Sequence, residues 1–339
     1  MTVDQRFLVA TGMRNEGPFI VEWVCWYRML GFEILVATND CTDHSTDLLN
    51  ALQEAGWLTH APHKPREGQP PQKSALRKVM NHPLTAEVDW TLVCDVDEFL
   101  VLHQHETIAD LIGPPPHDFM AMTFNWKCFG HAEWEKYQDG IVHRQFRRCG
   151  IGHLPTNRSY KAMLSNPLEW KRLGAHCPHG FTGDWAAPES RVVTPNRVLL
   201  PQFNTPENHP IRLLEKDQIE HEVAQMNHYI IRAKESYDHK RGIPSAAGFK
   251  DRYTDDFFQR YNKNGMRDVT AARFQERFSA IHAEALELPN VLRLHHICCA
   301  EYVTRMNEKL GQDPHADPRF HHHMAIAKRV AATRGEPLE

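Results

Sequence analysis

The sequence of 339 residues has no excess of basic charge and no long apolar run. Lysine and arginine total 39 against 43 acidic residues, for a net charge of -4, so the basic surplus that binds a nucleic-acid backbone is missing. No uncharged stretch approaches the ~18 apolar residues of a membrane-spanning helix, and the N-terminus has no basic segment followed by an apolar one. These absences argue against a nucleic-acid partner and predict a cytoplasmic protein with at most peripheral membrane contact.

The eight cysteines form no CxxC pair and several interrupt apolar stretches, which is typical of small buried side chains in a reducing compartment. Two histidine-rich segments could suggest a metal. "LHHICC", at residues 294–299, has no second ligand pair with zinc-like spacing, so it is interpreted as a buried strand rather than a zinc site. The triplet from His321 to His323 is interpreted as an exposed helix start rather than a metal site.

Short apolar runs alternate with helix-like spacings over the first hundred residues. After Pro18, apolar side chains recur at the spacing of one helix face, and Gly31 follows as a stop signal. Three such helices are expected, each after a run with the length and composition of a strand. The four strands are predicted in "RFLVATGM", "EILVATND", "WLTHAP" and "DWTLVCD". This alternation indicates an α/β fold, with a mostly parallel sheet flanked by helices.

The rest of the chain lacks this regular alternation. Residues 116–245 hold short extended stretches with many prolines and aromatics, so we expect an irregular α+β half packed on the same sheet as residues 1–115. Residues 246–339 are predicted to form a helical C-terminal extension, whose last thirty residues are polar enough to fray. Helical spacing is present in "IEHEVAQMNHYIIRAKESYDHKR" and "TAARFQERFSAIHAEAL".

The segment "CDVDEFLVL", residues 94–102, ends the fourth predicted strand in negative charge. In extended chain Asp95 and Asp97 share one side while Val96 points to the other. Two close carboxylates repel one another unless a cation or hydrogen-bond donors lie between them, and a hard ion such as Mn²⁺ or Mg²⁺ meets that need. The alternative is a solvated acidic turn.

Two further strand ends carry polar residues that could converge with the acidic segment on one ligand. They are residues 11–16 and residues 39–43. In an open α/β sheet, ligands bind outside the carboxyl ends of the strands.

Five segments in this order resemble the bacterial family 2-like glycosyltransferases, which have the GT-A fold and a D-x-D motif. They are "TGMRNEGPFIVEWVCWYRMLGF", "VATNDCTDHSTDLL", "QKSALR", "DWTLVCDVDEFL" and "MNHYIIRAKESYDHKRG". The resemblance is strong over residues 7–102, patchy over 120–245 and absent beyond. It implies a metal-dependent, hexosyltransferase-like enzyme that moves a sugar, with inversion, from a nucleotide-diphosphate sugar to a glycan, lipid or other hydroxyl acceptor. A UDP-sugar is the expected donor, and no oligomeric state is predicted.

The same resemblance implies that residues 1–115 bind the nucleotide sugar and that residues 116–245 form the acceptor and catalytic half. Asp40 would contact the base or ribose, Asp95 the ribose or sugar, and Asp97 the metal that bridges the diphosphate. Arg14 stands where lysine is commoner in the family, and it could equally pair with Glu16 on the surface. The residues implied in nucleotide-sugar binding are Thr11, Arg14, Asn15, Glu16, Asn39, Asp40, Lys73 and Asp95.

In the second half, similar enzymes complete the metal site with a histidine. His228 in "NHY" is the first choice and His176 in "GAHCPHG" the second, since imidazole is an acceptable Mn²⁺ ligand among oxygens. Either residue could instead be a packed histidine. Lys240 and Arg241 could neutralise the departing diphosphate or could form a solvated helix face.

An inverting transfer needs a base for the acceptor hydroxyl. Glu133 is the first candidate and Asp184 the alternative, although each could be an ordinary surface acid. Trp126, Trp134 and Trp185 could stack on sugar rings or belong to the core.

Two other classes of protein use similar residues. A nucleotidyltransferase that makes activated sugars would show a Gly-rich phosphate loop, which "ATGMRNEG" is not. A non-catalytic nucleotide- or sugar-binding module would not need both Asp95 and Asp97. Release of free nucleoside diphosphate from nucleotide sugars would distinguish the three.

Overall fold

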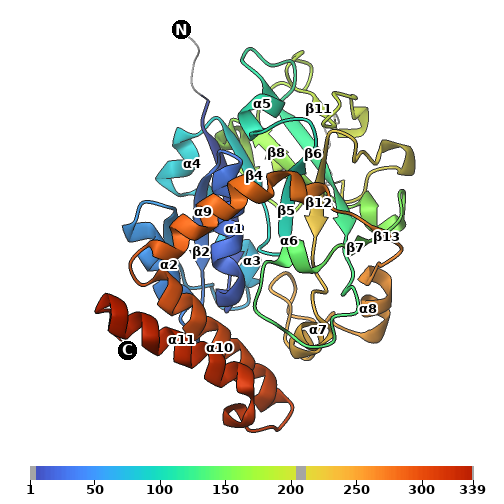
Figure 1. The fold of residues 1–339 in the computed structure, drawn as a ribbon. Helices are drawn as coiled ribbons and strands as arrows, with labels where there is room; N and C mark the ends of the chain where they lie inside the picture. Colours follow the sequence, from blue (N-terminus) through green and yellow to red (C-terminus); the bar gives the residue numbers. More distant parts are fainter. Residues whose placement is uncertain (1–4, 204–210, 338–339) are drawn as a thin grey trace.

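The computed structural model describes residues 5–203 and 211–337 of the chain. Its N-terminal part consists of the alternating strands and helices that the sequence predicts (Figure 1). The helix α1 is buried on almost every side, consistent with its aromatic and branched side chains, and it begins with a proline in its first turn. The elements of this part are β1 (Phe7–Met13), α1 (Gly17–Met29), β2 (Glu33–Thr38), α2 (Ser45–Glu54), β3 (Thr59–Pro62), α3 (Pro71–Met80), α4 (Pro83–Glu87) and β4 (Trp90–Val93).

The middle of the chain adds more strands to the same sheet. The strand order is β3-β2-β1-β4-β8-β6-β12-β5, with β11 paired to β6. Only β8 and β5 oppose the common direction, so seven of these nine strands are mutually parallel. The elements of this part are β5 (Glu98–Leu102), α5 (Ile108–Ile112), β6 (Ala121–Cys128), α6 (Val142–Gln145), β7 (Arg148–Cys149), β8 (Tyr160–Ser165), β9 (Trp170–Arg172), β10 (His179–Phe181), β11 (Val192–Val193), β12 (Ala224–His228) and α7 (Lys234–Lys240).

The sheet is curled, and the short link between β4 and β5 shows why. These strands are four neighbours apart in the strand order, which would separate them by about 19 Å in a flat sheet. Only residues 94–97 connect them, in a turn closed by a 3.0 Å hydrogen bond from the Glu98 amide to the Asp95 carbonyl. A turn cannot span that distance, so the two ends of the path must approach one another. The acidic segment lies at this closing point.

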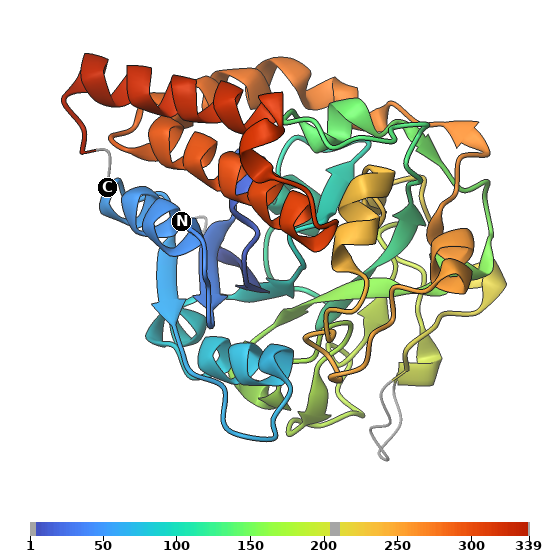
Figure 2. The ribbon, with the colours of Figure 1, turned by 90° about the horizontal axis from the view of Figure 1, so that it is seen from below.

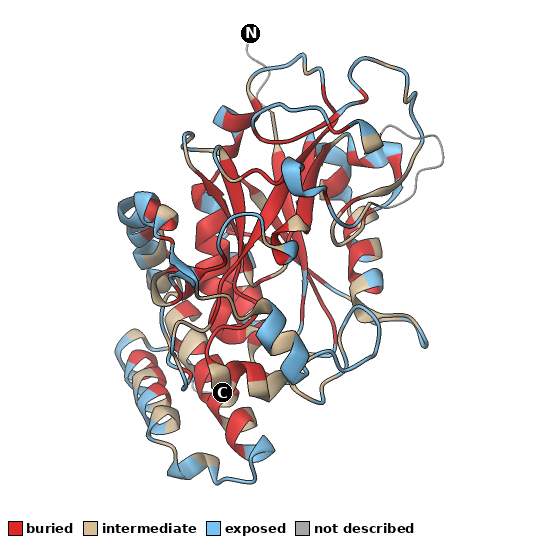
Figure 3. Ribbon diagram, turned by 90° about the vertical axis from the view of Figure 1, so that its right-hand side faces the viewer, coloured by how far each residue is buried: buried red, intermediate tan, exposed pale blue. Residues whose placement is uncertain are grey.

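Helices of the C-terminal part cover one face of the sheet beside α1 (Figure 2). They share one continuous core with the strands, from Phe7 in β1 to Ala327 in α11. Figure 3 shows that the central strands are buried, whereas the helices at the edge of the molecule have exposed outer surfaces. The elements are α8 (Asp255–Tyr261), β13 (Met266–Arg267), α9 (Gln275–Glu287), α10 (Val291–Lys309) and α11 (Pro318–Arg334).

These observations confirm the predicted fold class, an α/β fold with a mostly parallel sheet flanked by helices. The irregular second half and the helical C-terminal part are also present. No helix within the described ranges has both the length and the apolar character needed to cross a membrane.

Three local predictions were wrong. "LHHICC" is not a strand but the middle of α10, because short apolar runs fit a buried helix face equally well. The segment predicted to be helical around residue 225 contains β12, which is paired on both sides by β5 and β6. The last thirty residues contain the ordered helix α11, capped by Asp317 and packed on α10. In this helix His321 and His322 are exposed as predicted, but His323 is buried.

The contact between α1 and α10 gives a stability prediction. A Cβ atom at Gly17 would overlap the Cβ and Sγ atoms of Cys298, whereas one at Gly248 would meet open space. We expect Gly17→Ala to lower the free energy of unfolding by ~1–3 kcal/mol, because the two helices must move apart. Gly248→Ala should change it by less than ~0.5 kcal/mol. Urea unfolding of both variants is the measurement, and equal effects would contradict the close approach of the helices.

Candidate functional site

A buried lysine holds the acidic turn in place. Lys161 lies near the start of β8, and because β8 runs antiparallel to β4, this start meets the carboxyl end of β4. The Lys161 ammonium is fully buried and lies 2.9 Å from Asp95 Oδ2 and 2.8 Å from Glu98 Oε2. The same Glu98 oxygen accepts a 2.7 Å hydrogen bond from the Asp95 amide. The turn is therefore fixed by one cation and two carboxylates.

The charges of this network depend on burial. Burial lowers the pKa of Lys161, but the adjacent Asp95 and Glu98 outweigh that effect and raise it overall. Burial raises the pKa of Glu98, and the adjacent Lys161 ammonium opposes that shift by favouring the carboxylate. An ammonium this buried is stable only while its partners remain, since an uncompensated buried charge is costly.

Sheet register places His228 beside Asp97. His228 ends β12, directly opposite Glu98 in β5, and the next amide, of Tyr229, donates a 2.8 Å hydrogen bond to the Asp97 carbonyl. The His228 Nε2 atom lies 3.6 Å from Asp97 Oδ1. Burial lowers the pKa of His228 to about 4, so its imidazole is neutral near pH 7 and free to bind a metal.

These two residues fit a divalent ion. Asp97 Oδ1 and His228 Nε2 face one another as one oxygen and one nitrogen ligand, and Mn²⁺ or Mg²⁺ commonly takes its remaining ligands from water and substrate phosphates. Asp95 differs, because its carboxylate is committed to Lys161. The geometry therefore favours Asp97 and His228 over Asp95 as metal ligands.

His176 and Trp126 lie next to His228. The Trp126 ring centroid is 4.0 Å from that of His228 and 5.2 Å from that of His176. His176 Nδ1 is 3.0 Å from the Tyr160 carbonyl oxygen, beside Lys161 in β8. Both predicted histidines thus border the acidic turn, with the tryptophan between them.

Several positively charged side chains act electrostatically on the Asp97 carboxylate. Burial alone would raise the pKa of Asp97. The pKa is nevertheless held at about 2 by His228, Lys240, Arg232 and Arg252. Because His228 is neutral near pH 7, the positive charge there comes from Lys240 and the two arginines. This surplus suits a ligand with more negative charge than one carboxylate, such as a diphosphate.

Sequence reasoning missed Lys161, Arg232 and Arg252. Lys161 could have been noticed, since it interrupts the otherwise apolar strand "YKAMLS". Arg232 is 2% exposed, has a φ of 56°, and reaches Glu16 at 3.3 Å. Its guanidinium carbon lies 3.4 Å from the centroid of the Phe19 ring. The sequence around Arg232 and Arg252 contains no pattern that predicts a position near the acidic turn.

The loops after β1 and β2 lie at the same edge of the sheet, as predicted. Asn15 joins them through its amide group, which donates to Thr42 Oγ1 at 3.0 Å and accepts from the Thr42 amide at 2.8 Å. Asn39 donates to Asp40 Oδ2 at 3.0 Å. Thr11 is buried at the end of β1. These loops form a polar rim beside β4.

Three further predicted residues have different surroundings. Arg14 and Asp40 are exposed on this rim, and Lys73 is exposed in the first turn of α3. The pairing proposed between Arg14 and Glu16 is not what the structure shows, since Glu16 instead meets Arg232. The contacts of Arg14, Asp40 and Lys73 with a nucleotide remain predictions.

Glu133, Asp184 and Arg241 make no hydrogen bond or ion pair with the acidic turn among the described residues. Glu133 is exposed with a φ of 68° in the loop after β6. Asp184 is exposed and accepts a 2.8 Å hydrogen bond from the Ala186 amide. Arg241 pairs with Asp238 at 2.9 Å and with Asp255. Their roles stay predictions.

Trp134 and Trp185 are partly buried and packed against the core. Packing against the core was the alternative to stacking on sugar rings that the sequence left open for these side chains.

The C-terminal helix α10 supports the rim. Arg305 donates to Asp43 Oδ2 at 3.1 Å, and Glu301 pairs with His44 Nδ1 at 2.7 Å. The loop after β2 is therefore held from the side opposite the sheet.

No family model matches this sequence, and no curated protein matches it. Among solved structures, mannosyltransferase PcManGT from Pyrobaculum calidifontis, in complex with GDP-Man and Mn²⁺, is 14% identical over 99% of this chain and 88% of that chain, with a TM-score of 0.36. S. aureus TarS 1-349 with UDP-GlcNAc is 12% identical over 90% and 83%, with a TM-score of 0.34. The complex of TarS 1-349 with UDP is 16% identical, with a TM-score of 0.30, and this chain spans about half of it, 47%. Similarity this low leaves function to be argued from the site.

The Lys161 network gives the next prediction. Lys161→Met removes the cation from buried Glu98 and should cost ~3–5 kcal/mol of unfolding free energy. Adding Glu98→Gln should recover part of this loss, because the second variant removes the carboxylate that was left unpaired. Lys171→Met, at an exposed position of β9, is the matched control. Urea unfolding is the measurement, and a loss below ~1 kcal/mol for Lys161→Met would show that the network does not hold the turn.

Burial of neutral His228 predicts acid sensitivity. Its pKa is lowered from 6.5 to about 4 on folding, so the unfolded chain binds the proton more readily in this range. The free energy of unfolding should therefore fall as pH falls from 6.5 towards 4, by up to ~1.4 kcal/mol per pH unit from this residue. Urea unfolding with a chelator present measures the slope. His228→Gln should flatten it, while exposed His321→Gln should not, and equal slopes in wild type and His228→Gln would refute the assignment.

Proposed function

We propose that the chain is a metal-dependent glycosyltransferase that uses a nucleotide-diphosphate sugar. The observation that carries this proposal is the arrangement around Asp97, where one carboxylate and one neutral imidazole face each other among three cationic side chains. One divalent ion and one diphosphate would satisfy both sets of charges. The resemblance of residues 7–102 to family 2-like glycosyltransferases, and the position of the site at the carboxyl ends of β1, β2 and β4, support the same function.

The residues have separate tasks in this proposal. The rim formed by Asn15, Asn39 and Asp40 binds the nucleoside, and Asp95 faces the ribose or sugar while Lys161 fixes its orientation. Asp97 and His228 would hold Mn²⁺ or Mg²⁺, which supplies positive charge to the leaving diphosphate.

Three cations would assist the departure of the nucleoside diphosphate. Lys240, Arg232 and Arg252 lie around Asp97 in place before the reaction, so little reorganisation is needed as negative charge develops. Arg241 is a weaker candidate for this task than its neighbour Lys240, because it already pairs with Asp238 and Asp255.

A glycan or lipid-linked hydroxyl would approach from the half that carries Trp126, whose ring lies against His228. Glu133 and Asp184 remain the predicted bases for an inverting transfer.

Release of nucleoside diphosphate tests the function. With Mn²⁺, we expect the protein to release UDP or GDP from at least one UDP- or GDP-sugar, and Asp97→Asn to reduce turnover by at least ~100-fold. Asp97→Asn should also remove the Mn²⁺ dependence of diphosphate binding, measured by calorimetry, while the variant remains folded by circular dichroism. Asp118→Asn, with a side chain that is 80% exposed, is the control.

Other products would point to the other classes. Pyrophosphate released from a nucleoside triphosphate and a sugar phosphate would identify a nucleotidyltransferase. Mn²⁺-dependent binding of nucleotide sugars without turnover, across UDP- and GDP-sugars, would identify a binding module. Unchanged binding in Asp97→Asn would refute the metal assignment.

A further inference from the structure

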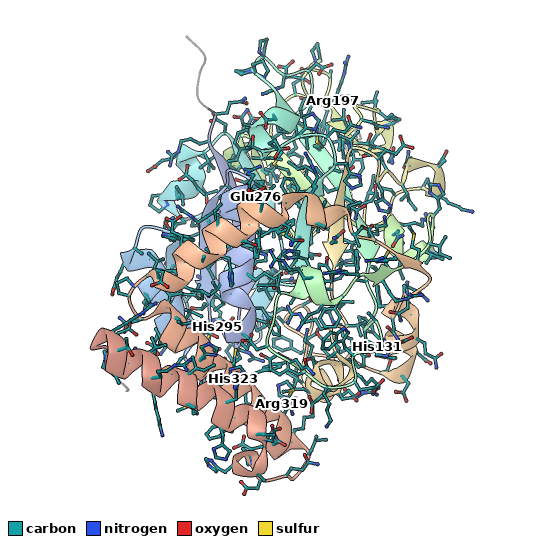
Figure 4. The ribbon with its side chains drawn as sticks, in the orientation of Figure 1. His131, Arg197, Glu276, His295, Arg319 and His323 are labelled. Carbon is teal, nitrogen blue, oxygen red and sulfur yellow. The ribbon has the colours of Figure 1, made fainter. Side chains whose placement is uncertain are left out.

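A second cluster of metal-ligand side chains lies where the loop after β6 meets α10 and α11. Asp139 comes from that loop, His295 and Cys299 from α10, and His323 from α11. Figure 4 shows His295 and His323 pointing towards this junction, close to Arg319. His295 and Cys299 are four residues apart, so they share one face of the helix.

Three ligand atoms of this cluster converge on one point. The His295 Nε2 atom lies 3.3 Å from both oxygens of Asp139 and 3.6 Å from Cys299 Sγ. In a tetrahedral zinc site, with bonds of about 2.0–2.1 Å to nitrogen and oxygen and about 2.3 Å to sulfur, neighbouring ligands lie about 3.3 Å apart for nitrogen and oxygen and about 3.6 Å apart for nitrogen and sulfur. The two spacings from His295 are those of zinc ligands around a common centre, and the Asp139 and Cys299 ligand atoms lie within 4.8 Å of one another.

The same geometry argues against a nucleophilic Cys-His-Asp triad. In a triad the histidine uses one ring nitrogen for the nucleophile and the other for the carboxylate. Here Nε2 of His295 faces both Cys299 and Asp139.

The neighbouring histidine pair is satisfied without an ion. Nδ1 of His296 and Nδ1 of His323 lie 2.9 Å apart, a hydrogen-bond distance for two neutral rings with one proton between them. Both rings are near Asp139, which belongs to both candidate sets, but their two Nδ1 atoms already bond to each other. The set that combines a thiol, an imidazole and a carboxylate is Asp139, His295 and Cys299.

We propose that Asp139, His295 and Cys299 bind one zinc ion, which links the loop after β6 to α10. Thiolate and imidazole ligands select zinc over the hard ions Mg²⁺ and Mn²⁺ that suit Asp97. A cavity of about 340 Å³, lined by Gln138, Asp139, Pro318, Arg319, His322 and His323, gives an ion access to the cluster. These three ligands leave one position of a tetrahedral ion open to water, and the assignment does not depend on the proposed transferase activity.

The position of the ion would connect two parts of the molecule. The loop that carries Asp139 belongs to the acceptor half, and α10 also holds the rim through Arg305. Arg319 of α11 reinforces the same junction by donating to the Tyr137 carbonyl at 2.8 Å and pairing with Glu235 at 2.6 Å. Binding at this point would fix the loop relative to the helix that supports the nucleotide side.

Metal analysis of the full chain tests the proposal. Protein purified without chelator, loaded with zinc and desalted should hold about one zinc per chain. Replacement of zinc by Co²⁺ should give the near-ultraviolet absorption of a thiolate-to-cobalt charge transfer. Cys299→Ser should abolish that absorption, and His295→Gln should weaken zinc binding by more than ~100-fold, which exceeds the typical cost of losing an outer partner of a ligand.

Two variants serve as controls. His322→Gln changes an exposed histidine that lines the same cavity, and it should keep both the zinc and the cobalt spectrum. Asp97→Asn should keep them too, because the proposed donor site is separate. If either ligand variant fails to fold, the cobalt spectrum of the wild-type protein decides the matter.

Several results would overturn the assignment. A wild-type protein that retains no zinc after loading, or whose cobalt form lacks the sulfur absorption, does not have this site. Loss of zinc in His322→Gln equal to that in His295→Gln would point to surface binding. Two ions per chain, one of them lost in His296→Gln, would replace the single-ion site with a pair bridged by Asp139.

Discussion

The Lys161 ammonium is the constraint on which the proposed donor site depends. It is fully buried between Asp95 and Glu98, and it closes the turn that brings β5 back against β12 in the curled sheet. That closure in turn sets the register that places His228 opposite Glu98 and beside Asp97. An intact buried ion pair adds little net free energy to the fold, whereas removal of one partner is strongly destabilising. Its effect here is geometric, because the network permits one arrangement of the acidic turn.

The helix α10 has a comparable role on the other side of the site. Along its length it meets the loop after β2 through Glu301 and Arg305, and it carries His295 and Cys299 towards Asp139. The buried side chains of the C-terminal part thus belong to the same hydrophobic core as those of the first and second halves of the chain. The positions of the rim loops depend on a helix that lies outside the region resembling known glycosyltransferases.

Much of the N-terminal fold could be predicted because hydrophobic periodicity is a local signal, and strand ends identify an edge of the sheet. Asp95 and Asp97 lie at that edge as predicted, but in a turn rather than on one side of an extended chain, and they face different partners, Lys161 and His228. Lys161 could not be assigned, because its partner Asp95 is 66 positions away in sequence. The strand β12 was missed because pairing with two neighbours, rather than propensity, determines its conformation. Asp139 and His295 are 156 positions apart, so ligand spacing in the sequence gave no sign of their cluster.

The separation of these partners also sets an order of events during synthesis. At roughly 5–20 residues per second, Lys161 leaves the ribosome about 3–13 seconds after Asp95, given their 66-residue separation. Arg305 follows Asp43 by 262 residues, or about 13–52 seconds. The early strands of the sheet therefore emerge while their acidic turn has no counterion and their rim loops have no support. A nascent chain can assemble this half of the sheet early, but the edge that carries the rim loops becomes complete only when the last helices have been translated.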